Sequence, residues 1–312
     1  MSMANKMYDL VIIGGGPAGA AAGVYAARKK VRSVLITEEW GGQSTVSPDI
    51  QNWIGEVSLR GIDMADKLKK HLEAVRGDIL EIVEPDSVVE VSKEHDVFKV
   101  VTYGGKIFQA KAILVASGSR RKKLNVEGAE RLDNKGVMYC ASCDAPLFDG
   151  QKVVVVGGGN SGFEAAEQLL DYASEVYLFQ KNDKFVADSI AVERVLKNPK
   201  MTAWTNTQIK EIRGEKFVES VTYIKEGEEK KMEVGGVFVE IGSLPNSDIV
   251  KGLVDLNEYN EIKIDCKNQM TSCEGIWAAG DVTEGRFKQN NISMGDGVKA
   301  LEDIYIWLSK KK

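Results

Sequence analysis

The chain has 312 residues, of which 43% are apolar and 28% are charged, and its formal net charge is −5. This composition fits a globular protein of more than one domain and excludes a disordered, collagen-like or disulfide-stapled chain. The mild acidity argues against nucleic acid as the main partner, and no apolar run approaches the roughly 20 residues that a membrane span needs. The start, MSMANKMYDL, has no long apolar segment, so we expect no signal peptide and a cytoplasmic protein.

Residues 9–29, DLVIIGGGPAGAAAGVYAARK, predict a buried strand, a glycine-rich turn and a helix. The turn has the GxGxxG spacing at Gly14, Gly16 and Gly19. In such a turn the first glycine allows the tight bend, the second lets the backbone approach a pyrophosphate, and the third lets helix pack on strand. The next strand, predicted over 31–39, brings Glu38 to the position of a ribose-contacting side chain. This unit is therefore expected to bind a dinucleotide.

The next marked feature is a CASC motif at 140–143, followed directly by Asp144. A C-x-x-C dithiol can close into a disulfide, and one of its thiols often has a lowered pKa. A neighbouring carboxyl can exchange protons with such a thiol. There are two alternatives: a zinc site that also uses Cys266 and Cys273, or a pair of buried packing cysteines. The wide spacing of Cys266 and Cys273 disfavours zinc, and we interpret these two as structural.

A second glycine-rich unit follows over 152–170, KVVVVGGGNSGFEAAEQLL, with Gly157, Gly159 and Gly162 at the same spacing. The strand predicted over 175–183 places Gln180 at the ribose position. Two such units, each between a strand and a helix, predict two bound dinucleotides; two structural glycine turns without ligands are the alternative.

Apolar strands that end in glycine are predicted over 112–118, 236–242 and 275–281, and alternating patterns predict hairpins over 87–103 and over 219–225 with 231–240. The C-terminal residues, DGVKALEDIYIWLSKKK, predict a helix. The second glycine unit lies inside the chain of the first. We therefore predict an α/β protein with two Rossmann-like three-layer domains, one of residues 1–116 plus 244–312 and, inserted into it, one of residues 117–243.

A dithiol between two dinucleotide units suggests a flavoprotein in which a nicotinamide nucleotide reduces a flavin and the flavin reduces a disulfide. In this combination the sequence resembles the low-molecular-weight thioredoxin reductases and the catalytic part of the flavoprotein component of alkyl hydroperoxide reductase. The fused thioredoxin-like domain of that component is not expected here. The motifs that carry the resemblance are GGGPAG (14–19), GGQ (41–43), QNWIG (51–55), GVMYCASCDAPLF (136–148), GGGNSG (157–162), GSLPN (242–246), AAGD (278–281) and KQ (288–289).

The resemblance implies roles for individual positions. Cys143 would face the flavin, Cys140 would attack the partner's disulfide, and Asp144 would act as general acid or base. FAD would be bound by Gly14, Gly16, Gly19, Glu38, Gly42, Gln43, Asn52, Gly280, Asp281 and Gln289. NADPH or NADH would be bound by Gly157, Gly159, Gly162, Gln180 and Lys181. Further cofactor contacts are expected at Pro17, Ala18, Gly118, Asn160, Ser161, Gly242 and Lys288.

The resemblance also implies thioredoxin or a thioredoxin-like protein as partner, a homodimer, and a nicotinamide domain that rotates on hinges near 117 and 243. Two departures from the family pattern stand out. Ala145 replaces the usual glycine after CxxCD, and Gln180-Lys181-Asn182 replaces the His-Arg-Arg run that clamps the 2′-phosphate of NADPH. One lysine holds phosphate less well than two arginines, so NADH or dual use is favoured slightly over strict NADPH.

Several alternatives stay open. The partner could be glutaredoxin-like or linked to a peroxiredoxin, or the donor could be ferredoxin or another reductant, with a vestigial nicotinamide site. A non-catalytic flavoprotein and a zinc-stabilised binding protein are the alternatives from other classes.

Overall fold

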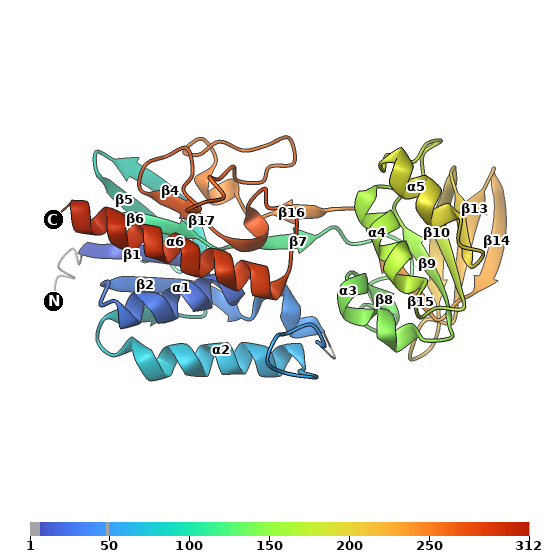
Figure 1. Ribbon diagram of the computed structural model, residues 1–312, viewed down its shortest axis with the longest axis horizontal. Coiled ribbons are helices and arrows are strands. Elements are labelled where there is room, and N and C mark those ends of the chain that lie inside the picture. The colour runs from blue at the N-terminus through green and yellow to red at the C-terminus, as the bar shows by residue number, and fades with distance from the viewer. Residues whose placement is uncertain (1–6, 48–49, 312) are drawn as a thin grey trace. The chain divides into compact units, whose positions relative to one another are not determined.

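The computed structural model describes residues 7–47 and 50–311, so the six N-terminal residues that entered the signal-peptide prediction lie outside it. The chain forms two compact units, drawn in Figure 1. The first comprises Met1–Val46, Trp53–Arg120 and Leu244–Lys312, and the second comprises Ser47–Asn52 and Arg121–Ser243. The two stretches of chain that connect them, β7 (Ser119–Arg121) and β16 (Ser243–Pro245), pair with each other as a two-stranded sheet.

The first unit is built on one mixed sheet with the strand order β3-β2-β1-β6-β5-β4, and β17 also pairs with β6. The strands β1, β2, β3, β6 and β17 are parallel, whereas β4 and β5 form the antiparallel hairpin predicted over 87–103. The strand bounds are β1 (Met7–Gly15), β2 (Ser33–Trp40), β3 (Leu80–Val83), β4 (Val88–Glu94), β5 (Val97–Thr102), β6 (Ile107–Val115) and β17 (Ile276–Ala278).

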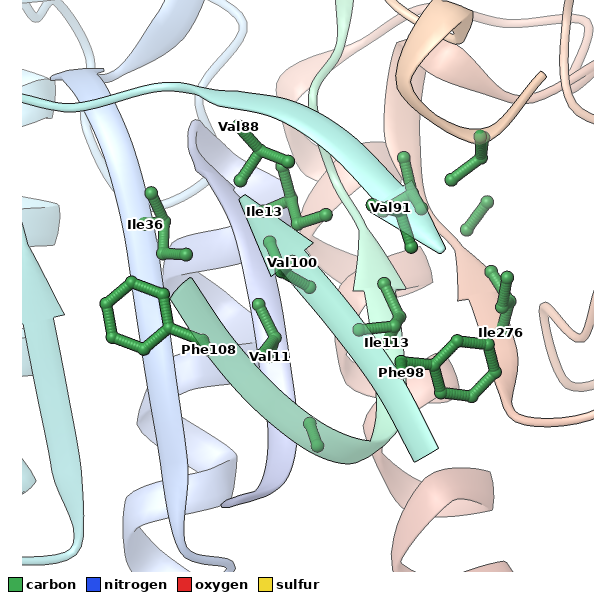
Figure 2. Close-up of a cluster of buried hydrophobic side chains, with 14 of the residues drawn as sticks. Val11, Ile13, Ile36, Val88, Val91, Phe98, Val100, Phe108, Ile113 and Ile276 are labelled. Atoms are coloured by element: carbon green, nitrogen blue, oxygen red, sulfur yellow. The ribbon is translucent and has the colours of Figure 1, made fainter. Parts of the chain in front are cut away.

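Both faces of this sheet are buried, as the continuous apolar run of β1 predicts. Leu10 and Ile12 point to the face that is covered by the helices α1 (Pro17–Arg28), α2 (Gly61–Arg76) and α6 (Asn290–Lys310). Val11 and Ile13 point to the other face, where they pack with side chains of β4, β5 and β17, as Figure 2 shows. Short 3-10 turns follow at η1 (Gly42–Val46), η3 (Asp248–Val250) and η4 (Gly280–Val282).

The second unit repeats this plan with a five-stranded parallel sheet in the order β11-β10-β9-β15-β8. Val153 and Val155 of β9 pack against helix α4, and Val154 and Val156 pack against the antiparallel meander β12-β13-β14. Helix, sheet and meander thus form three layers (Figure 1). The bounds are β8 (Val137–Met138), α3 (Ala141–Asp144), η2 (Ala145–Phe148), β9 (Lys152–Val156), α4 (Asn160–Leu169), β10 (Glu175–Phe179), α5 (Ser189–Leu196), β11 (Met201–Trp204), β12 (Thr207–Arg213), β13 (Ser220–Lys225), β14 (Glu228–Glu233) and β15 (Gly236–Val239).

The parallel strands of the two sheets, with the helices packed on them, confirm the α/β class and the two Rossmann-like folds. One predicted hairpin strand was wrong: residues 231–240 do not form one strand. The chain leaves the meander after β14 and enters the parallel sheet at Gly236, which pairs with Val153, and the N–H of Gly235 donates to the carbonyl oxygen of Lys152 at 2.9 Å. Within 7–47 and 50–311, no helix is both long enough and apolar enough to cross a bilayer.

Candidate functional site

The first glycine turn connects β1 to α1 through contacts that only glycine tolerates. Gly14 has a φ of +115°, and a Cβ there would lie 2.3 Å from the carbonyl oxygen of Ala116. A Cβ on Gly19 would lie 1.9 Å from the carbonyl oxygen of Gly14. By contrast, no atom lies within 4 Å of a Cβ built on Gly16. The first and third glycines are therefore fixed by the fold, whereas the second faces open space.

This open space is a cavity of about 500 Å³, a size typical of cofactor sites. Ten of the sequence-predicted positions line it: Gly14, Gly16, Pro17, Ala18, Glu38, Gly42, Gln43, Gly118, Gly280 and Asp281. Polar residues that the sequence did not single out also line it: Ser44, Asp86, Ser117, Asn246, Asn290 and Ser293. Neighbouring bonds orient some of these groups, because Ser44 Oγ donates to Asn290 Oδ1 over 2.7 Å and Ser293 Oγ donates to Asp281 Oδ1 over 3.3 Å.

Three of the positions expected to bind FAD, Gly19, Asn52 and Gln289, do not line this cavity, and neither does Lys288, which was expected as a further cofactor contact. Asn52 belongs to the second unit, and Gln289 precedes the first turn of α6. The ammonium of Lys288 bonds to the carbonyl oxygens of Asp281 (3.3 Å) and Thr283, and it forms an ion pair with Glu261 at 3.0 Å. Lys288 therefore holds in place the backbone segment that carries Asp281.

The second glycine turn, between β9 and α4, repeats the first almost atom for atom. Gly157 has a φ of +123°, and a Cβ there would lie 2.2 Å from the carbonyl oxygen of Glu240. A Cβ on Gly162 would lie 1.9 Å from the carbonyl oxygen of Gly157, whereas a Cβ on Gly159 would meet nothing closer than 3.8 Å. The free N–H groups at the start of the ten-residue helix α4, where the exposed Asn160 and Ser161 lie, are suited to a phosphate.

Gln180 follows β10, but its side chain is turned into the glycine loop. Its amide oxygen accepts from the N–H of Gly158 at 3.2 Å, and its amide nitrogen donates to the carbonyl oxygen of Lys184 at 3.0 Å. The residue is 8% exposed, so a ribose hydroxyl would have to replace one of these bonds. Lys181 is exposed at the end of the same strand, and Gly242 is exposed with a φ of +95°.

Gln180→Ala is therefore expected to weaken NADH and NADPH binding by a similar factor, about tenfold, because a buried N–H loses its partner and the loop loses an anchor. Dissociation constants for both nucleotides, measured by calorimetry, would test this. Lys181→Ala is the matched control at the exposed neighbour, and it should affect NADPH more than NADH. A change in only one of the two dissociation constants with Gln180→Ala would instead indicate a direct contact to the ribose.

The C-x-x-C motif lies at the start of α3, and Cys140 and Cys143 form a disulfide with a Cα–Cα distance of 5.3 Å. Both residues are half-buried, and the N–H groups of Cys143 and Asp144 donate to the carbonyl oxygen of Cys140 at 3.2 and 3.0 Å. Asp144 is 6% exposed, and its Oδ1 has no hydrogen-bond partner among the described residues. Burial raises the pKa of Asp144 to about 6, although the charge of Arg121 acts to lower the pKa. A carboxyl with such a pKa can both give and take a proton near neutral pH.

The other two cysteines are free thiols: Cys266 is exposed and Cys273 is half-buried. Across the part of the chain that the structure covers, no three His, Cys, Asp or Glu side chains are grouped to hold a metal ion.

The family model "pyridine nucleotide-disulphide oxidoreductase" matches residues 8–297. The chain belongs to this family of oxidoreductases. Membership implies the binding of FAD and of a nicotinamide nucleotide, in agreement with two glycine turns and one cavity of cofactor size.

Solved structures and curated relatives extend the likeness. The thioredoxin reductase from Streptococcus pyogenes superposes with a TM-score of 0.89 at 33% identity, covering 98% of this chain and 100% of that one. The thioredoxin reductase from Giardia duodenalis also gives 0.89, at 30% identity, covering 97% and 99%. An alkyl hydroperoxide reductase component of Staphylococcus aureus is 38% identical over 97% of this chain, and an NADH dehydrogenase of Bacillus subtilis is 37% identical over 97%. The chain spans about 60% of the length of these two curated relatives.

Proposed function

We propose that this oxidoreductase carries electrons from NADH or NADPH, through FAD, to the Cys140–Cys143 disulfide and on to the disulfide of thioredoxin or a thioredoxin-like protein. The observation that carries the proposal is this disulfide, which lies beside the buried carboxyl of Asp144 in the unit that holds the second glycine turn. The proposed domains are residues 1–116 plus 244–312 for FAD and 117–243 for the nucleotide and the dithiol.

The residues present fit both cofactors. The first glycine turn, Glu38 and the polar side chains around Asp281 surround a cavity into which Gly16 presents bare backbone. Gly159 presents bare backbone in the same way at the start of α4. When bound, FAD supplies the two-electron carrier between nucleotide and dithiol.

Reduction of the Cys140–Cys143 bond consumes two electrons and two protons and gives two thiols. The Cys140 thiol gives its proton to Asp144, and its thiolate attacks one sulfur of the partner's disulfide and releases the other as a thiolate, which takes that proton from Asp144. The Cys143 thiol then gives up its proton by the same route, and its thiolate attacks the sulfur of Cys140 and reforms the intramolecular disulfide. The second partner sulfur leaves as a thiolate and takes up this proton, so that the partner is released as a dithiol. The role split between Cys140 and Cys143 rests on the family resemblance.

A second partner class has support from the curated relatives named as alkyl hydroperoxide reductase components, which point to a thioredoxin-like module linked to a peroxiredoxin. A cytoplasmic homodimer is part of the proposal and rests on the resemblance.

An anaerobic titration of the purified protein tests the proposed function. The flavin absorbance is expected to bleach fully with close to two equivalents of NADH or NADPH, because the first electron pair passes on to the Cys140–Cys143 disulfide. The more efficient of the two nucleotides is the donor. Dithionite serves as the control that flavin is present and reducible. Bleaching by dithionite but by neither nucleotide would contradict the nicotinamide step and direct attention to ferredoxin or another donor.

A further inference from the structure

The acidic residue Glu240 lies where a dinucleotide is expected to cross the sheet of the second unit. In the order β11-β10-β9-β15-β8, the strand sequence reverses between β9 and β15. Open parallel sheets bind their ligands beyond the carboxyl ends of the strands at such a switch point. Glu240 directly follows β15, its N–H donates to the carbonyl oxygen of Val156 at 2.8 Å, and its own carbonyl oxygen closes on Gly157. Its backbone thus forms one wall of the glycine turn.

The alternation of side chains along β15 shows which layer the Glu240 carboxyl enters. Val237 and Val239 pack in the core on the meander side, whereas Phe238 packs in the core on the α4 side. Because side chains alternate along a strand, Glu240 is placed on the same side as Phe238, with α4. Phosphates are expected at the start of α4, and the adenosine end lies toward β10, where Lys181 follows. The other end of the dinucleotide, the nicotinamide ring, therefore lies toward β15 and Glu240.

Burial and the charge of Arg121 act in opposite directions on the protonation of the Glu240 carboxyl. Burial raises the pKa of Glu240 to about 7; the charge of Arg121 acts to lower this pKa, and the Glu164 carboxylate on α4 acts to raise it. The charge of Arg121 acts on the pKa of Asp144 of α3 in the same direction, so one guanidinium influences both carboxyls. A small change in local charge is therefore sufficient to ionise or neutralise Glu240 near neutral pH.

We propose that Glu240 is a specificity-determining residue of the nicotinamide half-site, which distinguishes oxidised from reduced nucleotide by the charge of the ring. This inference rests on the proposed function, in which the second unit binds NADH or NADPH. The nicotinamide ring is a cation in the oxidised nucleotide and is neutral after it gains a hydride. An ionised Glu240 stabilises the cation and a protonated Glu240 does not. By linkage, binding of the oxidised nucleotide expels the proton from Glu240.

The test uses the FAD-loaded protein and two probes, NAD⁺ and tetrahydro-NAD, a neutral-ring analogue that cannot donate a hydride. The phosphorylated pair, NADP⁺ and tetrahydro-NADP, is titrated in parallel. Each dissociation constant is measured at about pH 6 and about pH 8.5. At each pH the constant for the oxidised nucleotide is divided by the constant for its neutral analogue. This ratio removes the binding energy of pyrophosphate and adenosine, which the two probes share. An opposite charge within about 4–6 Å shifts a carboxyl pKa by roughly 1–3 units. In the wild type, the constant for the oxidised nucleotide divided by that for the analogue should therefore fall about five- to tenfold between the two pH values.

In Glu240→Gln, which keeps the size and polarity of the side chain, this ratio should be independent of pH. Glu164→Gln, at an exposed position of α4, is the matched carboxylate variant: it should keep a pH trend, but one displaced to lower pH, because a charge that raises the pKa of Glu240 is removed. An equal pH trend in wild type and Glu240→Gln would overturn the inference. The wild type alone offers a second test: the release of protons when NAD⁺ binds near pH 7. Calorimetry in buffers of different ionisation enthalpy measures this release. If no protons were released, the inference would also be overturned. Binding of none of the four probes at either pH would overturn the proposed function as well, which separates the two failures.

Discussion

Replacing Cys140 by serine is expected to lower disulfide reduction by roughly a thousandfold or more, while the flavin is still reduced by nicotinamide nucleotide. A serine hydroxyl is a poor nucleophile at neutral pH, so the partner's disulfide is no longer attacked. The residue is half-buried at the start of α3, and serine is close to cysteine in size, so the protein should still fold and retain FAD. Turnover is measured with a bacterial thioredoxin and with dithiobis-nitrobenzoate as probes, and flavin reduction is measured by anaerobic titration.

Two further cysteine variants complete this experiment. Cys143→Ser is expected to stop electrons from leaving the reduced flavin, so that reduced flavin accumulates in the presence of nucleotide and partner. Cys266→Ser, at an exposed free thiol, is the matched control and should behave as the wild type. Full thioredoxin reduction by Cys143→Ser would remove the dithiol from the mechanism. Loss of flavin reduction in Cys140→Ser would contradict the division of roles between the two sulfurs.

Gly19→Ala is expected to destabilise the first unit with or without FAD, whereas Gly16→Ala should matter only when FAD is bound. A methyl group on Gly19 would lie 1.9 Å from the backbone oxygen of Gly14, which cannot move without opening the turn. We expect a loss of roughly 3 kcal/mol in the free energy of unfolding, the upper end for overpacking. A methyl group on Gly16 meets no protein atom within 4 Å and points into the cavity. It should therefore collide only with the bound cofactor.

The measurement is the melting temperature of each variant with and without FAD, together with the FAD dissociation constant. Gly16→Ala should match the wild type without FAD and bind FAD about 10–100-fold more weakly, the equivalent of about 1–3 kcal/mol. Equal FAD affinity for Gly16→Ala and the wild type would show that the pyrophosphate does not lie over this turn. An unchanged melting temperature for Gly19→Ala without FAD would contradict the packing argument.

The sequence predicted the parts of this protein that depend on local backbone chemistry. The GxGxxG turns, the strands before them and the hairpin at 87–103 are recognisable because their glycine spacing and periodicity are properties of short segments. The break at Gly235 was missed because the residues after it pair with β9, whose Lys152 and Val153 are distant in the sequence.

The walls of the cavity were harder to predict for the same reason. Asp86, Asn246, Asn290 and Ser293 come from separate segments and meet only in the folded unit. Gln180 was predicted within a strand over 175–183, whereas β10 ends at Phe179, and the direction of its side chain depends on the N–H of Gly158 and the carbonyl of Lys184. No pattern in the sequence indicates that these two groups lie within its reach.

Each of the paired connectors β7 and β16 begins within a few residues of the backbone that closes one glycine turn. Gly14 rests on the carbonyl of Ala116, two residues before Gly118, and Gly157 rests on the carbonyl of Glu240, two residues before Gly242. The N–H of Asn246 donates to the carbonyl of Gly118 at 3.0 Å, and the N–H of Lys122 donates to that of Gly242 at 3.0 Å, which fastens the two connectors at both ends. The backbone that closes each glycine turn is therefore continuous, within two residues, with a connector that is hydrogen-bonded to the other connector. A substitution that breaks one of these two bonds would alter the support of both turns at once.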